Sequence, residues 1–187
     1  MLELLVKSLE ECPVIKRGEY NYFIHPVTDG IPRLEPVMLS DVCDTIAKVS
    51  DLNVDYILTM ESMGIHISSV LSQKTGLPVN IVRKKQYWLS GEIVLDQTTG
   101  YGKGKMYINC VKKGDRVLVV DAVVSTGGTL VAVLQALKKA GVVVKDAVCV
   151  IERGEGKRVV KEQTGFDVKT LVKIDVLDKV RVLKKYY

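Results

Sequence analysis

Apolar and polar positions alternate along the chain in two rhythms, one typical of helices and one typical of strands. Apolar residues at helical spacing predict helices at residues 2–11, 39–49, 65–74, 128–140 and 157–164. Compact apolar runs predict strands at residues 20–24, 54–58, 79–82, 106–109, 117–121, 142–151 and 168–174. Because strands alternate with helices, the pattern predicts an α/β fold with a mainly parallel central sheet flanked by helices.

Single residues predict where several helices begin and end. Pro13 is expected to stop the first helix, because proline cannot continue a helical hydrogen-bond ladder. Ser40 or Asp41 is expected to cap the second helix through its side-chain oxygen. Gly76 and Gly141 follow the third and fourth helices, where glycine favours the left-handed turn that ends a helix.

Residues 84–105 interrupt this rhythm. The segment is polar, contains four glycines and lacks a long apolar period. A stretch of about 20 residues without packing signals is usually functional or disordered. We therefore expect a functional loop here, with Tyr87 and Trp88 serving loop packing or an interface.

Composition narrows the class of protein. With 187 residues, 47% of them hydrophobic, the chain is expected to be a single domain with a substantial core. No apolar run is long enough for a membrane span, and acidic residues interrupt the N-terminal apolar stretch, which excludes a signal peptide. The four cysteines are scattered without metal spacing, as in reduced cytosolic proteins, so we expect a cytoplasmic location.

Charge adds little to this picture. The net charge of +5 permits an anionic ligand such as a phosphate compound, and it does not require nucleic acid. The short basic clusters are most simply solvated surface. Two histidines are too few for a His-rich metal site.

The most informative segment is residues 117–129. An apolar strand ends at Asp121, and a short loop, Ser125–Thr129, leads directly into a helix. Ligands of open α/β sheets bind beyond the carboxyl ends of the strands, and a helix N-terminus favours an anion. Two glycines let the loop close around a phosphate, its hydroxyls add donors, and Asp121 is suited to accept from sugar hydroxyls. The segment therefore favours a ribose 5-phosphate, although an ordinary capped turn has the same outline.

This segment resembles the phosphoribosyl-diphosphate loop of the type I phosphoribosyltransferases. Their pattern is four apolar residues, two acids, two apolar residues, a small residue and TGGT. The match here is Val117–Val120, Asp121, Val123-Val124 and Ser125–Thr129. Further segments resemble the family's diphosphate loop, mobile loop and N-terminal hood: residues 55–65, the run from Arg83 into the Gly-rich stretch, and residues 12–13 with 20–23.

The whole chain resembles the archaeal hypoxanthine/guanine branch of this family, which is built on the adenine-type plan. The resemblance implies one phosphoribosyltransferase domain over residues 1–187, with a hood at 1–35 and a mobile loop at 84–105. It implies transfer of the phosphoribosyl group from 5-phosphoribosyl diphosphate to hypoxanthine or guanine, giving IMP or GMP and diphosphate in purine salvage. It also implies Mg²⁺ held through the substrate and a homodimer, without membrane or nucleic-acid partners.

The resemblance also assigns roles to residues. Asp121 is the expected catalytic residue. On this resemblance, the 5-phosphate is expected to bind Ser125, Thr126, Gly127, Gly128 and Thr129, and the ribose is expected to contact Asp121 and Ala122. The diphosphate is expected to bind Glu61, Ser62, Met63, Gly64, Arg83, Lys84 and Lys85. The purine is expected to stack on Phe23 and to contact the main chain of Tyr22 and Ile24. Tyr101 is expected to contact the substrates from the loop. For Phe23, simple core packing is the alternative.

Three departures from the family pattern bear on the chemistry. Ser125 is small where the human-type hypoxanthine enzymes place an acid near the base, which fits the adenine-type branch. Ala122 stands where the family usually has a second acid, which removes a hydrogen bond to the ribose. The adenine branch often has a loop glutamate near Tyr101, and only Glu92 and Asp96 lie nearby, so the proton donor to the base remains open. Adenine or xanthine specificity is a second interpretation. A third is a catalytically weak, purine-sensing regulator.

Overall fold

The computed structural model describes residues 2–18, 20–99 and 102–187. The helices are α1 (Glu3–Glu11), α2 (Pro26–Asp29), α3 (Pro36–Val49), α4 (Ile65–Thr75), α5 (Gly128–Lys139) and α6 (Gly156–Thr164). The strands are β1 (Val14–Arg17), β2 (Tyr20–Phe23), β3 (Tyr56–Met60), β4 (Val79–Val82), β5 (Ile93–Thr99), β6 (Gly102–Ile108), β7 (Arg116–Val124), β8 (Val143–Arg153), β9 (Lys169–Val176) and β10 (Val180–Lys185).

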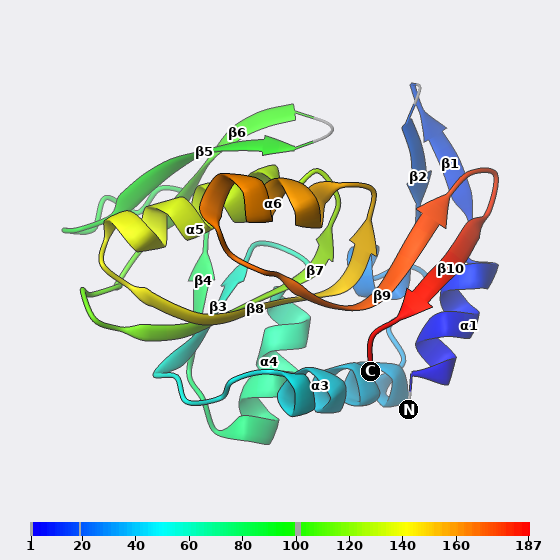
Figure 1. The fold of residues 1–187 in the computed structure, drawn as a ribbon, viewed down its shortest axis with the longest axis horizontal. Coiled ribbons are helices and arrows are strands. Elements are labelled where there is room, and N and C mark those ends of the chain that lie inside the picture. The colour runs from blue at the N-terminus through cyan, green and yellow to red at the C-terminus, as the bar shows by residue number, and fades with distance from the viewer. Residues whose placement is uncertain (1, 19, 100–101) are drawn as a thin grey trace.

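A six-stranded sheet forms the centre of the molecule, in the order β10-β9-β8-β7-β3-β4 (Figure 1). Every neighbouring pair is parallel except β9 with β10, which is antiparallel. This confirms the predicted α/β class with a mainly parallel sheet. The edge strand β10 was not predicted, because its apolar residues are interrupted by basic ones, as is typical of an exposed edge.

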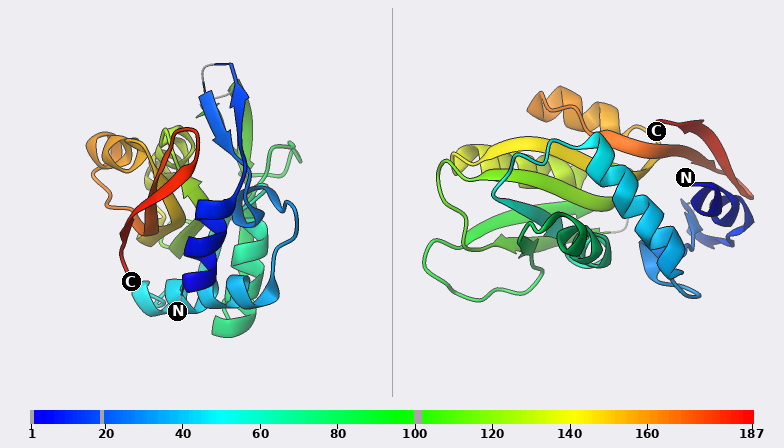
Figure 2. Two further views of the ribbon diagram at one scale, coloured as in Figure 1. Left: turned by 90° about the vertical axis from the view of Figure 1, so that its right-hand side faces the viewer. Right: turned by 90° about the horizontal axis from the view of Figure 1, so that it is seen from below.

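Successive residues of β7 point to opposite faces of the sheet, which divides the core in two. Leu118 and Val120 pack with α1, α3 and α4 on one face. Val117 and Val119 pack with α5 and α6 on the other. The two helical layers lie on opposite sides of the sheet in Figure 1, and Figure 2 shows the same arrangement from below. Burial on both faces explains why β7 reads as a continuous apolar run.

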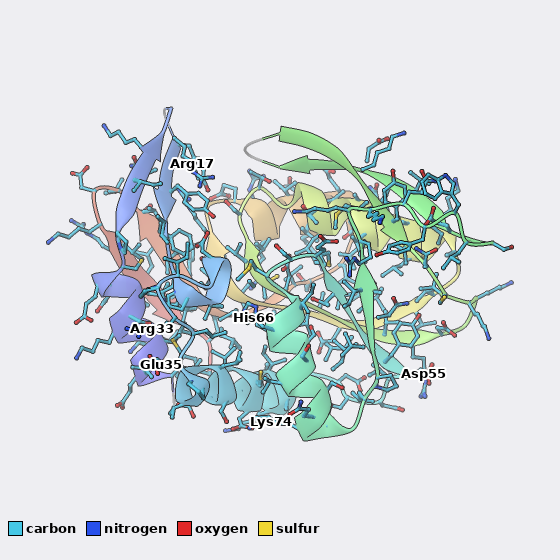
Figure 3. All side chains as sticks on the ribbon, turned by 180° about the vertical axis from the view of Figure 1, so that it is seen from behind. Arg17, Arg33, Glu35, Asp55, His66 and Lys74 are labelled. Atoms are coloured by element: carbon cyan, nitrogen blue, oxygen red, sulfur yellow. The ribbon has the colours of Figure 1, made fainter. Side chains whose placement is uncertain are left out.

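Two antiparallel hairpins project from the same side of the molecule (Figures 1 and 3). One is β1–β2, in the region predicted as the hood. The other is β5–β6, in which Leu95 pairs with Met106. The segment predicted as a functional loop, residues 84–105, therefore contains strand structure that the sequence pattern did not predict. Its polar sequence alternates with apolar residues, and Leu95 and Met106 pack into the core beside α5.

Helix boundaries follow the sequence with one correction. Neither Ser40 nor Asp41 caps α3. The helix begins one turn earlier, after Glu35, with Pro36 in its first turn. Gly76 ends α4 with a φ of 74°, as predicted. Lys74, labelled in Figure 3, joins α4 to α3 through a 2.7 Å ion pair with Asp44. Within the described residues, no helix is long and apolar enough to cross a membrane.

Candidate active site

A cleft of about 280 Å³ opens beyond the carboxyl ends of β3 and β7. In a parallel sheet the loops that follow the strands meet at this edge, so residues distant in sequence come together. Six segments line the cleft: β2, α2, the end of β3 with its loop, the residues after β4, the end of β7 with the start of α5, and the end of β8. Their lining residues are Tyr20, Tyr22, Phe23, Thr28, Met60, Glu61, Ser62, Met63, Lys84, Asp121, Ala122, Val123, Val124, Ser125, Thr126, Gly127, Gly128, Thr129, Leu130 and Arg153.

All five residues predicted to hold a phosphate, Ser125–Thr129, line this cleft. Gly127 precedes α5 with a φ of 83° and brings no capping side chain, so N–H groups of the first turn remain available to an anion. A Cβ on Gly127 would lie 2.6 Å from the Gly156 carbonyl oxygen, and a Cβ on Gly156 would lie 2.3 Å from that of Ser125. The loop is therefore pressed against the start of α6, and both glycines are required by close backbone contact.

Asp121 lines the cleft as predicted and is half-buried, but β7 continues beyond it to Val124 and does not end there. Burial raises the pKa of this carboxyl to about 7, although the Ala122 N–H and the charge of Lys84 both lower it. The Ala122 N–H donates to Asp121 Oδ1 at 2.8 Å. Ala122 itself is 1% exposed and packs in the core. Its main chain therefore orients the neighbouring carboxylate, while its side chain offers the cleft no polar group.

The predicted diphosphate loop follows β3. Glu61, Ser62 and Met63 line the cleft, and the peptide bond between Glu61 and Ser62 is cis. Gly64 does not line the cleft, because it lies behind the loop against β3 and β7. A Cβ there would come 2.0 Å from Thr59 Oγ1, whose hydroxyl donates to the Val120 carbonyl at 2.8 Å. Gly64 therefore sets the path of the loop by its lack of a side chain.

The three basic residues predicted for the diphosphate have different places. Lys84 lines the cleft and lies close enough to Asp121 to lower its pKa. Arg83 is not among the lining residues, since its Nε lies 2.9 Å from Glu61 Oε2. Lys85 is exposed, 5.9 Å from the ring centroid of Tyr87. The Lys84 N–H also donates to Glu61 Oε2 at 3.1 Å, so Glu61 fixes the backbone that presents Lys84.

The hood contributes side chains that the sequence only partly identified. Tyr22 and Phe23 line the cleft, whereas Ile24 does not and instead donates its N–H to the Pro13 carbonyl at 2.9 Å. Arg17, labelled in Figure 3, lies 4.1 Å from the Tyr22 ring centroid. The Tyr22 hydroxyl donates to Asp29 at 2.5 Å, which ties the hairpin to α2.

Arg153 and Tyr20 line the cleft and were not assigned a role from sequence. Arg153 ends β8, and its Nη2 donates to the Asn21 carbonyl at 2.6 Å. Its Cζ lies 4.1 Å from the Tyr20 ring centroid and 6.0 Å from that of Phe23. Arg153 is the last residue of a buried strand, and this position at a carboxyl strand end is the signal that would have found it.

The remaining loop candidates lie elsewhere. The Glu92 carboxylate accepts from the N–H groups of Tyr87 and Trp88 and from the side chain of Asn109, so it anchors its own loop and is not among the residues lining the cleft. Trp88 is 78% exposed. Tyr101 lies outside the described residues.

The comparisons with known proteins agree with this geometry. Residues 36–176 match the family model described as phosphoribosyl transferase domain. A protein of Methanothermococcus okinawensis named hypoxanthine/guanine phosphoribosyltransferase is 56% identical over 95% of this chain and 97% of its own length. Its namesake in Methanococcus vannielii is 53% identical over 98% of this chain and 100% of its own length.

Solved structures agree at the level of the fold. Adenine phosphoribosyltransferase of Thermoanaerobacter pseudethanolicus superposes with a TM-score of 0.73 at 22% identity, covering 91% of this chain and 98% of that one. The enzyme of Trypanosoma brucei, solved with AMP, pyrophosphate and ribose-5-phosphate, has a TM-score of 0.65 at 19% identity, covering 74% of this chain and 65% of that one. The family model and the near full-length relatives agree with the glycine-containing loop found after β7. This chain therefore belongs to the phosphoribosyltransferase family.

Proposed function

We propose that this protein transfers the phosphoribosyl group of 5-phosphoribosyl diphosphate to hypoxanthine or guanine, forming IMP or GMP and diphosphate in purine salvage. The observation that carries the proposal is the near full-length identity above 50% to relatives that bear this activity in their names. The cleft supports it independently, because a backbone phosphate loop, a carboxylate and an aromatic hood meet there.

Each part of the substrates has a place in the cleft. The 5-phosphate lies on Ser125–Thr129 at the N-terminus of α5, where backbone N–H groups and the helix dipole favour an anion. The ribose hydroxyls lie against Asp121, which accepts hydrogen bonds when ionised. The diphosphate lies between residues 61–63 and Lys84. The purine lies under the hood against Phe23.

The reaction forms a bond between a ring nitrogen of the purine and C1 of the ribose, and it breaks the bond between C1 and the diphosphate oxygen. Positive charge develops on the ribose in between, and negative charge develops on the leaving diphosphate. The protein's contribution is to hold the two reactants in line and to stabilise these charges. Asp121 faces the ribose charge, and Lys84 faces the diphosphate charge. The loop at residues 84–105 closes over the reactants and keeps water away from the cation.

Mg²⁺ fits this cleft as an ion held mainly by the substrate. Among the described residues, no group of three or more His, Cys, Asp or Glu side chains is placed to hold a metal ion. Asp121 and Glu61 line the cleft, and Glu61 is already engaged by Arg83. In phosphate-transfer sites Mg²⁺ commonly keeps several waters and binds substrate phosphates with one or two carboxylates. When bound, the ion would neutralise charge on the diphosphate, while Asp121 would accept hydrogen bonds from the ribose hydroxyls.

We extend the proposal to a cytoplasmic homodimer. The exposed Tyr87 and Trp88 are the candidate interface residues, because large apolar side chains at the surface often mark contacts between chains. Light scattering on the purified protein tests the dimer: a mass of one chain across the micromolar range would contradict it.

The decisive experiment offers hypoxanthine, guanine, xanthine and adenine separately to the protein with Mg²⁺ and 5-phosphoribosyl diphosphate. Chromatography then measures nucleotide formation by the natural chain and by Ala122→Asp. We expect rapid IMP and GMP formation by the natural chain. A preference for adenine or xanthine would mean that the proposed base is wrong. Turnover by Ala122→Asp but not by the natural chain would indicate that the natural chain binds these substrates without converting them. No nucleotide from either protein would refute the proposed transfer.

A further inference from the structure

The hood hairpin β1–β2 depends on contacts outside itself. Its two strands pair with each other and form a sheet of their own, apart from the central sheet. A hairpin of two strands is at best marginally stable in water, so its place over the cleft has to come from side-chain contacts with the rest of the molecule. Helix α2 follows the hairpin and is such a partner, because Pro26 and Val27 are buried and the helix contacts β7.

Asp29, the last residue of α2, joins this helix to the hairpin. Its Oδ1 accepts from the Tyr22 hydroxyl at 2.5 Å, and its Oδ2 accepts from the Thr28 hydroxyl at 2.6 Å and from the His25 N–H at 3.1 Å. An ionised carboxylate can only accept, so both hydroxyls are the donors in these contacts. Burial and the neighbouring Asp29 carboxylate raise the pKa of Tyr22 to about 12, so the phenol keeps the proton that it donates.

Both hydroxyl partners of Asp29 belong to side chains that line the cleft, Tyr22 from β2 and Thr28 from α2. Phe23 follows Tyr22 along the strand, and the two ring centroids lie 6.4 Å apart with 27° between the ring planes. One carboxylate therefore fixes the distance between the α2 wall of the cleft and the strand that carries Phe23. Asp29 is not among the lining residues, so any effect that it has on a ligand passes through its partners.

We propose that Asp29 is a positioning residue for the purine, because it holds Tyr22 and Thr28 together and so sets the hood strand with Phe23 at the base end of the cleft. The inference rests on the proposed function, which places the purine under the hood. Hydrogen bonds to an ionised group are about twice as strong as neutral ones, so a carboxylate holds the two hydroxyls more firmly than an amide. A change at Asp29 therefore affects ligands that carry a base more than ligands that consist of ribose and phosphate.

Asp29→Asn keeps the shape of the side chain, removes its charge and replaces one acceptor oxygen by a donor. Calorimetry compares the binding of IMP, which carries a base, with that of ribose 5-phosphate, which does not, so the result is independent of turnover. We expect Asp29→Asn to weaken the binding of IMP about tenfold, the scale of one hydrogen bond to a charged group, and that of ribose 5-phosphate less than about twofold. Steady-state kinetics adds a second readout: the variant raises KM for hypoxanthine more than KM for 5-phosphoribosyl diphosphate.

A double-mutant cycle tests whether Asp29 acts through its partners. Tyr22→Phe and Thr28→Val each remove one donor and are each expected to weaken the binding of IMP about threefold, the scale of a weaker single hydrogen bond. In the Asp29→Asn background, Tyr22→Phe is expected to add little, because the acceptor that the hydroxyl engages has already lost its charge. Full additivity of the two changes would show that Tyr22 and Asp29 act independently and would overturn the inference.

Asp115→Asn is the matched control. The Asp115 carboxylate also accepts from a tyrosine hydroxyl, that of Tyr56 at 2.9 Å, and from a backbone N–H, that of Lys112 at 2.8 Å. Tyr56 begins β3 and Asp115 precedes β7, so this pair lies at the amino ends of the strands, whereas the cleft opens beyond their carboxyl ends. We expect Asp115→Asn to lower stability in urea and to leave the binding of IMP and of ribose 5-phosphate unchanged.

The other outcomes separate the inference from the proposed function. Equal weakening of IMP and ribose 5-phosphate by Asp29→Asn would show a general effect on the cleft and overturn the positioning role. The same loss of IMP binding in Asp115→Asn would assign the effect to stability. A natural chain that binds IMP while Asp29→Asn binds it as tightly would refute the inference and leave the proposed function standing. A natural chain that binds neither ligand would contradict both.

Discussion

Two regions of the cleft that we propose to bind anions differ in how well the sequence predicted the residues that line them. In the phosphate loop, all five predicted residues, Ser125–Thr129, line the cleft. In the basic run Arg83-Lys84-Lys85, only Lys84 does. The first region is proposed to bind through backbone groups, whose direction is set by local glycine geometry and by the start of a helix. The second is proposed to bind through long side chains, whose direction is set by neighbours such as Glu61 and Tyr87. A local motif is therefore a better guide to backbone chemistry than to side-chain chemistry.

The largest effect is expected where the backbone of the phosphate loop has no room to move. Gly127→Ala adds a Cβ 2.6 Å from a backbone oxygen at a φ of 83°. A displacement of about 1 Å in a binding loop costs about 100-fold in rate, so we expect kcat/KM for 5-phosphoribosyl diphosphate to fall by about that factor. Steady-state kinetics measures it.

Gly154→Ala is the control for this change. Its φ is also positive, at 64°, but its nearest neighbour beyond the adjoining residues, the Ser125 carbonyl oxygen, lies 3.8 Å from the added Cβ. We expect a loss several times smaller. Similar losses for the two variants would show that backbone conformation, rather than close contact with α6, governs the loop.

The next effect is expected at Asp121, between the two regions. Asp121→Asn removes the charged acceptor for the ribose hydroxyls, which corresponds to a loss of about 10- to 100-fold in kcat/KM. Because the pKa of Asp121 is raised to about 7, the carboxyl is protonated below that pH and ionised above it. Affinity for 5-phosphoribosyl diphosphate should therefore rise as the pH rises through 7 in the natural chain. A profile for Asp121→Asn with the same slope would assign the titration to another group.

The basic run allows a direct test of side-chain placement. Lys84→Met is expected to raise KM for 5-phosphoribosyl diphosphate about tenfold, the scale of one charge-assisted hydrogen bond, and Lys85→Met less than about twofold. Since Lys84 lowers the pKa of Asp121, its loss should also move the pH profile of binding to higher pH. Lys85→Met should leave that profile in place. Equal kinetic effects of both variants would mean that the run acts as diffuse charge.

The smallest effect on turnover is expected at the foot of the hood, where His25 is fully buried. Its Nδ1 accepts from the Val27 N–H and its Nε2 lies 2.9 Å from Ser8 Oγ. Burial lowers the pKa of His25 to about 4, although Asp29 raises it. In the unfolded chain His25 is protonated below about pH 6.5, whereas in the folded chain it stays neutral down to about pH 4. Stability from this group is therefore complete above pH 6.5 and lost as the pH falls toward 4, by about 3 kcal/mol.

Urea unfolding at pH 7 and pH 4.5 measures this loss, with His25→Asn as the comparison. The variant should be less stable at pH 7 and should lose less stability on acidification, because it has no imidazole to protonate. An equal loss in both proteins would show that groups other than His25, such as carboxylates, cause the acid sensitivity.

Much of the fold follows from patterns that act over a few residues. The apolar run of β7, the glycine after α4 and the helical periodicity of α5 each encode structure locally, and the family resemblance based on residues 117–129 is confirmed. Strand β5, the first residues of β6 and the edge strand β10 were missed, because these strands are polar or basic on one side and are stabilised by partners elsewhere in the chain. The expected roles of the cleft residues remain predictions for the variants above.

What the sequence determined by itself was the parallel α/β fold, the loop after β7 and the position of Asp121 shortly before that loop, because strand burial and glycine-rich helix N-termini depend on neighbours in the chain. What only the tertiary structure decided was which side chains share the cleft. It turned Arg83 toward Glu61 and left Lys84 in the cleft, it packed Gly156 against the phosphate loop, and it brought Arg153 to Tyr20. These contacts join residues from different strands, so they depend on how the sheet orders its strands and not on any one segment.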